Sequence, residues 1–222
     1  MQISTVGFAV VLFLVPAVPG WHGNPDRHSL YLATLPVAAL LLVVYVVVTT
    51  RNLRTHSAAA RKPAAEGAWP LRRAIVTLGL ATVATALVSE ALVDSLDAFG
   101  RALGLSQFFV AVVIVALVGN AAEHGGAIVV ARRGNVRLGA EIAISSATQV
   151  AAFVAPIVAL ASGVIGRGLP LAFRPVEIGT MAVATVAAAI VTLDGRTRRW
   201  EGVALLSVYV LAVVAFALSG DR

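Results

Sequence analysis

Seven long apolar stretches constrain this chain more than any other feature of its sequence. Each approaches the roughly 20 residues that a helix needs to cross a bilayer. Hydrophobic residues make up 59% of the 222 residues and charged ones 13%, which is more apolar surface than one water-soluble core can bury. We therefore expect an all-α membrane protein with about seven transmembrane helices, near residues 3–18, 30–50, 74–96, 105–131, 138–162, 176–193 and 202–218.

The first stretch has two readings. It is short and contains Pro16, so it resembles the hydrophobic region of a signal peptide. However, it lacks the basic residues that precede such a region. A transmembrane helix is the favoured interpretation.

The basic residues give an orientation. The net charge of +6 would suit a nucleic-acid binder, but the 17 basic residues lie in short clusters between apolar stretches, and we expect no nucleic-acid partner. Twelve of them lie in the alternate loops 51–73, 132–137 and 196–199. Positive loops face the cytoplasm, which predicts a multi-pass protein of the cytoplasmic membrane with its N-terminus inside and its C-terminus outside. Residues 51–73 form a cytoplasmic basic linker between two helices in 1–50 and five in 74–222.

The densest polar cluster in apolar surroundings is residues 119–126. Its glycines and alanines, including Gly119, fit close helix packing, but an ionisable Glu123 at membrane depth is costly and indicates a functional site. Asn120 is three residues away and shares its helix face, whereas His124 points about 100° away. His124 is either an accessory site residue or a hydrogen-bonded packing residue.

A second polar stripe in 138–162 contains Ser146 and Gln149. Serine hydroxyls often bond only their own helix. Counted from a turn between Gly134 and Asn135, however, Ser146 lies at the depth of Glu123, and Gln149 at the depth of Asn120. Carboxylate, amide and hydroxyl oxygens suit Ca²⁺ or Na⁺. The glycines would let the helix break and present backbone carbonyls to the ion, so Gly119 is included in the predicted site.

These two polar stretches, 119–124 and 146–149 with Pro156, resemble the second α-repeat of the calcium/proton exchangers of the cation/Ca²⁺ antiporter superfamily. The resemblance covers essentially the whole chain. It implies half of an inverted-repeat cation antiporter fold, with the α-repeat at 105–163, and a secondary active transporter without a cofactor rather than an enzyme. It also implies that Glu123 binds Ca²⁺ and protons alternately, while Asn120, Ser146 and Gln149 shape the site.

Two features qualify the resemblance. Ser145 stands where the family usually has glycine, and no first α-repeat is found in these 222 residues. We therefore expect that a chain carrying the first α-repeat is needed; the alternative is a non-transporting membrane subunit or a truncated remnant. Glu90, in 74–96, is either an accessory residue on the ion path or a buried, hydrogen-bonded carboxyl group.

Overall fold

A computed structural model describes residues 2–22, 26–59, 69–193 and 198–220, and every regular element in these ranges is helical. The predicted all-α class is therefore confirmed for the described part of the chain. The helices are α1 (Gln2–Trp21), α2 (Arg27–Ala59), α3 (Leu71–Leu103), α4 (Gln107–Phe109), η1 (Val110–Val115), α5 (Ala116–Gly119), α6 (Ala121–Arg132), α7 (Val136–Gln149), η2 (Val150–Val154), α8 (Ala155–Val164), α9 (Pro175–Leu193) and α10 (Arg199–Ser219).

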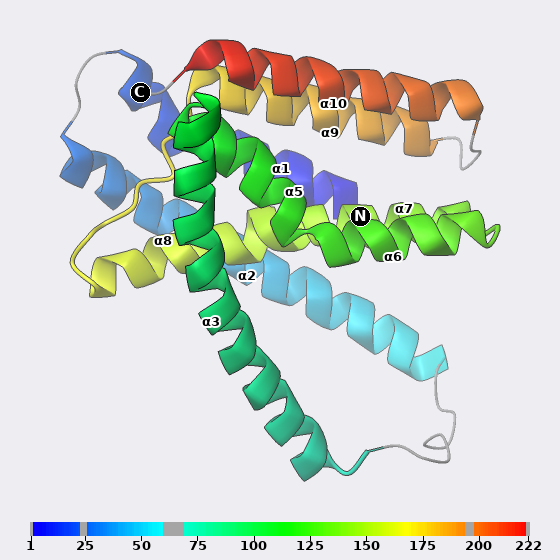
Figure 1. The fold of residues 1–222 in the computed structure, drawn as a ribbon. Coiled ribbons are helices and arrows are strands. Elements are labelled where there is room, and N and C mark those ends of the chain that lie inside the picture. Colours follow the sequence, from blue (N-terminus) through cyan, green and yellow to red (C-terminus); the bar gives the residue numbers. More distant parts are fainter. Residues whose placement is uncertain (1, 23–25, 60–68, 194–197, 221–222) are drawn as a thin grey trace.

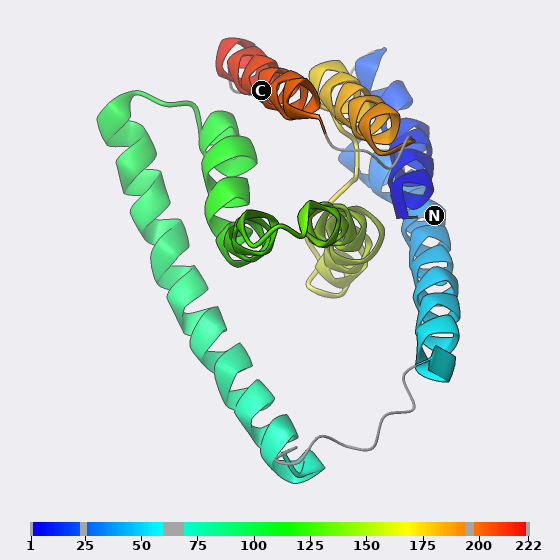
Figure 2. The ribbon, with the colours of Figure 1, turned by 90° about the vertical axis from the view of Figure 1, so that its right-hand side faces the viewer.

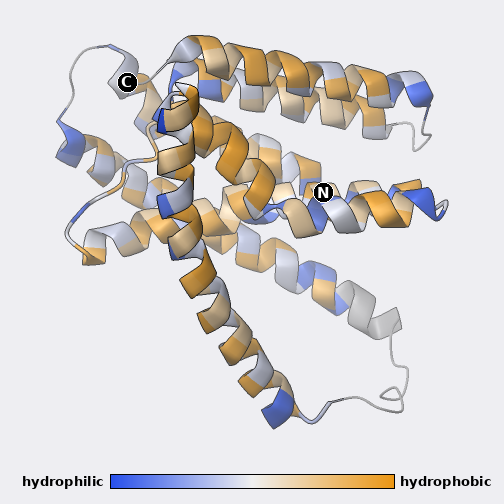
Figure 3. Cartoon of the chain, in the orientation of Figure 1, coloured by the Kyte–Doolittle hydropathy of each residue, from blue (hydrophilic) through white to orange (hydrophobic). Residues whose placement is uncertain are grey.

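Most of these helices have the length and the apolar surface of membrane-spanning segments. Five of them (α1, α2, α3, α9 and α10) are long and apolar enough to cross a membrane, as is the continuous run from α7 to α8, and the bent run from α4 to α6 would make a seventh span. Hydrophobic residues predominate along most of their length (Figure 3), and Leu80, Leu87 and Val203 are each more than 60% exposed. Because such surfaces are favourable only in hydrocarbon, the chain is a multi-pass membrane protein, as predicted.

The helices pack as a bundle with one outlier. α1 contacts α2, α7 and α9, while α6 and α7 form a hairpin and α9 and α10 another. α8 packs against α2. α3 lies apart from this bundle and approaches it near its C-terminal end (Figures 1 and 2), where it contacts η1.

A buried contact region joins α1 and α2 to the segment before α9. Phe13 of α1 is 2% exposed and packs on Phe173, with ring centroids 4.9 Å apart. Thr34 of α2 is fully buried, and its hydroxyl oxygen accepts a 3.0 Å hydrogen bond from the backbone N–H of Leu171. Tyr31 fills the space that a side chain at Gly163 would occupy. These contacts hold the segment before α9 in place, and so determine which face of α9 packs against α1.

The helices on either side of the predicted linker 51–73 extend into it. α2 continues to Ala59, and α3 begins at Leu71 after Pro70. Residues 60–68 lie outside the described residues. The boundaries 1–50, 51–73 and 74–222 thus remain sequence-based proposals, with helical backbone at both ends of the middle segment.

Two short π-helical segments lie in the predicted α-repeat. η1 comes five residues before Asn120, and η2 directly follows Gln149. π-Helical turns are rare and frequently mark functional sites, because they shift the hydrogen-bond pattern of the backbone. Both helices of the predicted site therefore have an irregular turn close to the polar residues.

Candidate functional site: a broken helix beside a cavity

The predicted fourth segment, 105–131, is not a continuous helix. α5 ends at Gly119, Asn120 takes φ −104° and ψ 17°, and α6 begins at Ala121. The two parts are bent by 52°, with the break about halfway along the bundle (Figure 1). A helix that ends inside a bundle leaves backbone carbonyl groups without intrahelical donors, as the broken helices of transporters do at their ion sites.

Asn120 connects the pieces around this break. Its side-chain N–H donates to the carbonyl oxygen of Ala116 at 2.9 Å, and its own carbonyl oxygen accepts from the backbone N–H of His124 at 3.0 Å. Its side-chain oxygen accepts from the hydroxyl of Ser146 at 3.3 Å. Asn120 therefore contacts α5 and α7 through its side chain and α6 through its backbone carbonyl.

Glu123 occupies the first turn of α6, three residues after the break. A carboxylate in this position is favoured by the helix dipole, which alone would be a structural reason for an acidic residue. Its side chain is exposed and lines a cavity rather than capping the helix, since no side chain caps the N-terminus of α6. The carboxylate is therefore accessible to an ion in the cavity.

The cavity has a volume of about 650 Å³ and two different walls. The polar wall, on α6 and the break before it and on α7, includes Asn120, Glu123, His124 and Ser146. The opposite wall, on α1 and α9, is mainly apolar and includes Phe13 and Met181. The wall formed by α6 and α7 thus presents side-chain oxygen atoms to the cavity, whereas the wall formed by α1 and α9 presents mainly apolar side chains.

The other predicted site residues lie elsewhere. Gln149 is exposed at the end of α7 and is not among the lining residues, and the same holds for Gly119, which adjoins the break. Glu90 is exposed on α3, away from the cavity. His124, predicted to point away from Glu123, lines the same cavity. The wall of α1 and α9 could not be predicted from the sequence, because apolar residues there carry no signal that separates cavity lining from ordinary packing.

The donor set suits a hard cation. Among the described residues, no three His, Cys, Asp or Glu side chains lie close enough together to hold a metal ion by themselves. The polar wall instead combines one carboxylate with an amide oxygen and a hydroxyl, which match the oxygen preference of Ca²⁺.

The fold and the site together define a class, that of helical membrane proteins with a carboxylate at a broken helix. The family described as sodium/calcium exchanger protein matches residues 73–218, which is well over half of the chain. The chain belongs to this family. The resemblance to calcium/proton exchangers of the cation/Ca²⁺ antiporter superfamily is confirmed.

Individual relatives agree with this assignment. The chain is 32% identical to the Ca(2+)/H(+) antiporter ChaA of Bacillus subtilis over 217 residues, covering 94% of this chain and 61% of the relative. It is 34% identical to a vacuolar calcium ion transporter of Schizosaccharomyces pombe, covering 97% and 54% respectively. The solved structure of native YfkE matches with a TM-score of 0.77 at 28% identity, over 98% of this chain and 62% of that one. The antiporter fold predicted for the chain is therefore confirmed, while the chain spans only 54 to 62% of these three proteins.

Proposed function

We propose that the chain contributes the Glu123 half of an ion site that exchanges cytoplasmic Ca²⁺ for protons. The observation that carries this proposal is the shared cavity wall of Glu123, Asn120 and Ser146 at a helix break within a membrane-spanning bundle. The names of the relatives in Bacillus subtilis and Schizosaccharomyces pombe, a Ca(2+)/H(+) antiporter and a calcium ion transporter, support it.

The exchange follows from the charge of Glu123. An ionised carboxylate in the cavity attracts a dehydrated cation, and a proton neutralises the same group when the cation leaves. An uncompensated charge at membrane depth is costly. A proton neutralises Glu123 by itself, whereas a bound Ca²⁺ needs a second negative charge besides Glu123. The site therefore changes its exposure only when it is protonated or when it holds Ca²⁺ with both negative charges. Net movement of one ion is then linked to opposite movement of the other.

The oxygen count indicates that the described cavity wall is half of a site. Ca²⁺ takes six to eight oxygen ligands and usually more than one negative charge. Glu123, Asn120 and Ser146 supply at most about four side-chain oxygens, and the wall of α1 and α9 is mainly apolar. We propose that a segment or chain carrying the first α-repeat supplies the others. A non-transporting subunit would offer the same number of oxygen ligands, so the experiment must distinguish such a subunit from half of a transporter.

The orientation remains the one that the basic loops predict. The C-terminal ends of α2, α6 and α9 and the N-terminal end of α10 lie at one end of the bundle (Figure 1). Arg54 of α2, Arg132 of α6 and Arg199 of α10 belong to these ends, and the three basic loops contain twelve of the 17 basic residues of the sequence. We infer that this side faces the cytoplasm.

The test compares two acid-to-amide substitutions in one hairpin. Glu123→Gln keeps the shape of the side chain but cannot bind and release a proton. Glu141→Gln is the matched control, because Glu141 is exposed and forms only a surface ion pair with Arg137 at 3.1 Å, which contributes at most about 1 kcal/mol. Both are expressed with a chain carrying the first α-repeat, and Ca²⁺ uptake driven by a pH gradient is measured in membrane vesicles. We expect uptake to fall to background in Glu123→Gln and to persist in Glu141→Gln.

Three results would contradict parts of the proposal. Persistent uptake in Glu123→Gln would remove Glu123 from the ion site. Robust uptake by the purified chain alone would show that no further α-repeat is needed. A wild-type chain that is stable and membrane-inserted but inactive with its partner would favour the non-transporting alternative.

A further inference from the structure

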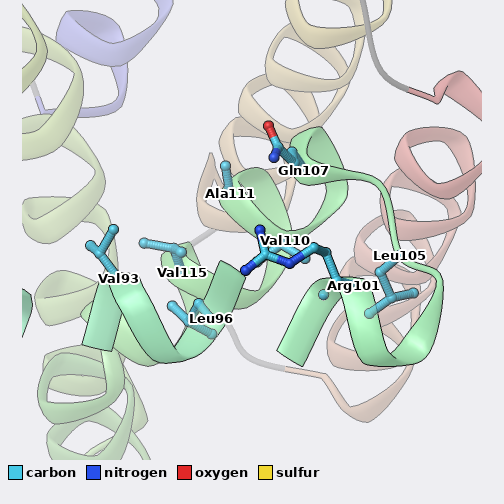
Figure 4. Close-up of a pocket in the computed structure, with 9 residues that line it drawn as sticks. Val93, Leu96, Arg101, Leu105, Gln107, Val110, Ala111 and Val115 are labelled. Carbon is cyan, nitrogen blue, oxygen red and sulfur yellow. The ribbon is translucent and has the colours of Figure 1, made fainter. Parts of the chain in front are cut away.

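A second groove, of about 350 Å³, lies between α3 and the start of the broken helix (Figure 4). It is separate from the cavity that Glu123 lines. Its walls are mainly apolar and include Val93, Leu96, Leu105 and Val110, and two polar side chains, Arg101 and Gln107, lie among them.

The groove follows from one close helix contact. A side chain at Gly100 would place its Cβ 2.9 Å from a methyl group of Val110, so α3 and η1 approach closely only because residue 100 is glycine. Leu96 and Val110 are buried beside this contact. Elsewhere along α3 large apolar side chains such as Leu80 are exposed, a surface that is favourable in contact with hydrocarbon.

The polarity of the groove changes along α3. Val93 and Leu96 make the inner part apolar, whereas Arg101, two residues before the helix ends, points into the groove from the outer part (Figure 4). α3 has 33 residues and is therefore about 50 Å long, more than the roughly 30 Å of the hydrocarbon core. A charged last turn then lies at the level of the lipid headgroups.

This arrangement matches an amphiphile with a negative head. An acyl chain beside Leu96 and Val110 would cover their apolar surface, and a phosphate at Arg101 would gain charge-assisted hydrogen bonds from a guanidinium group. Basic pockets between transmembrane helices bind anionic headgroups in this way. We propose that the groove holds one anionic phospholipid, which braces α3 against the helix that continues to Asn120. Arg101 also has a partner within the protein. An arginine that serves only this partner or the helix dipole would show no preference among lipids.

The experiment measures lipid retention and stability in detergent. Purified protein is mixed with phosphatidylglycerol or phosphatidylcholine; bound lipid is counted by native mass spectrometry, and thermal unfolding is followed in parallel. We expect one phosphatidylglycerol to be retained in preference, with a rise in melting temperature. Arg101→Gln should weaken this retention about fivefold, the effect of one basic residue at an anionic headgroup, and Arg101→Lys should keep most of it.

Two further variants separate the groove from general surface charge. Arg167→Gln removes an exposed arginine outside the groove and should retain lipid as the wild type does. Ala111→Phe fills the groove while leaving Arg101 in place, and should lose the lipid.

The outcomes decide between occupants. Equal retention of phosphatidylglycerol in Arg101→Gln, or full retention in Ala111→Phe, would overturn the proposal. If glycerol phosphate reproduced the rise in melting temperature, the ligand would be a free phosphate rather than a lipid. A dimer that Ala111→Phe abolishes would show that a second copy of the chain fills the groove, which would also overturn it.

Discussion

Gly139→Ala should separate the two helices that carry the candidate site. The position is buried where α7 crosses α6. A Cβ there would lie 2.8 Å from the carbonyl oxygen of Ala127 and 3.2 Å from the Cβ of Ala131. Because a relaxed C···O contact is about 3.3–3.6 Å and the closest atom is backbone, the helices must move apart by at least about 0.5 Å.

The displacement grows toward the site. The hairpin turns near Gly134 and Asn135, so Gly139 lies about 7 Å from the turn along the axis and Ser146 about 17 Å. If the helices pivot at the turn, 0.5 Å at Gly139 becomes roughly 1.2 Å at Ser146. The 3.3 Å contact between the hydroxyl of Ser146 and the side-chain oxygen of Asn120 then opens to about 4.5 Å, beyond hydrogen-bonding range.

Two measurements test this reasoning. The chain has no cysteine, so a pair at positions 120 and 146 reports the distance by its rate of disulfide formation. We expect slower cross-linking and an unfolding free energy about 1–3 kcal/mol lower than in the control Gly126→Ala. That control adds the same methyl group to the same hairpin, with nothing within 4 Å. A Gly139→Ala protein that cross-links at the unchanged rate and is as stable as Gly126→Ala would refute the argument.

Two other predictions concern orientation and packing. A cysteine at Ala65 should be labelled only from the cytoplasm and one at Ala102 only from outside, as the basic loops imply; labelling of both from one face would contradict the helix count. Thr34→Val should lower the unfolding free energy by about 1–3 kcal/mol, because the backbone N–H of Leu171 loses its buried acceptor. Thr82→Val removes an exposed hydroxyl that donates to its own helix, and should change the unfolding free energy by less than about 0.5 kcal/mol. Equal losses in both variants, measured by chemical unfolding, would contradict a stabilising role for the Thr34 hydroxyl.

The apolar stretches predicted the spans well, because the length of such a stretch is set mainly by the thickness of the bilayer. The predicted turn between Gly134 and Asn135 is also observed, since α6 ends at Arg132 and α7 begins at Val136. The irregular turns were not predictable in the same way. The valine-rich residues 110–115 read as ordinary apolar helix, and nothing in their side chains distinguishes π-helical from α-helical hydrogen bonding.

The break at Asn120 explains where the predicted geometry of the site differs. Counting equal depths assumes two straight helices, and it paired Asn120 with Gln149. A 52° bend changes both the rise and the rotation after residue 119, and the observed partner of Asn120 is Ser146. His124 follows Glu123 within α6 and stays about 100° from it around the helix, so the cavity that both side chains line extends around that part of the helix. Glycine and asparagine in the sequence permitted a break, but only the tertiary contact with α7 decides its angle.

The contacts of Asn120 also explain why an amide suits this position. Its nitrogen donates to Ala116 on one side of the break, and its oxygen accepts from Ser146 on the neighbouring helix. An ionised aspartate could only accept, and a leucine could do neither. Because both bonds belong to one planar group, a movement of α5 relative to α7 strains at least one of them. If the ion site that we propose includes Ser146, an ion bound there would favour one arrangement of α5 against α7 over another, which is the link that alternating exposure of such a site requires.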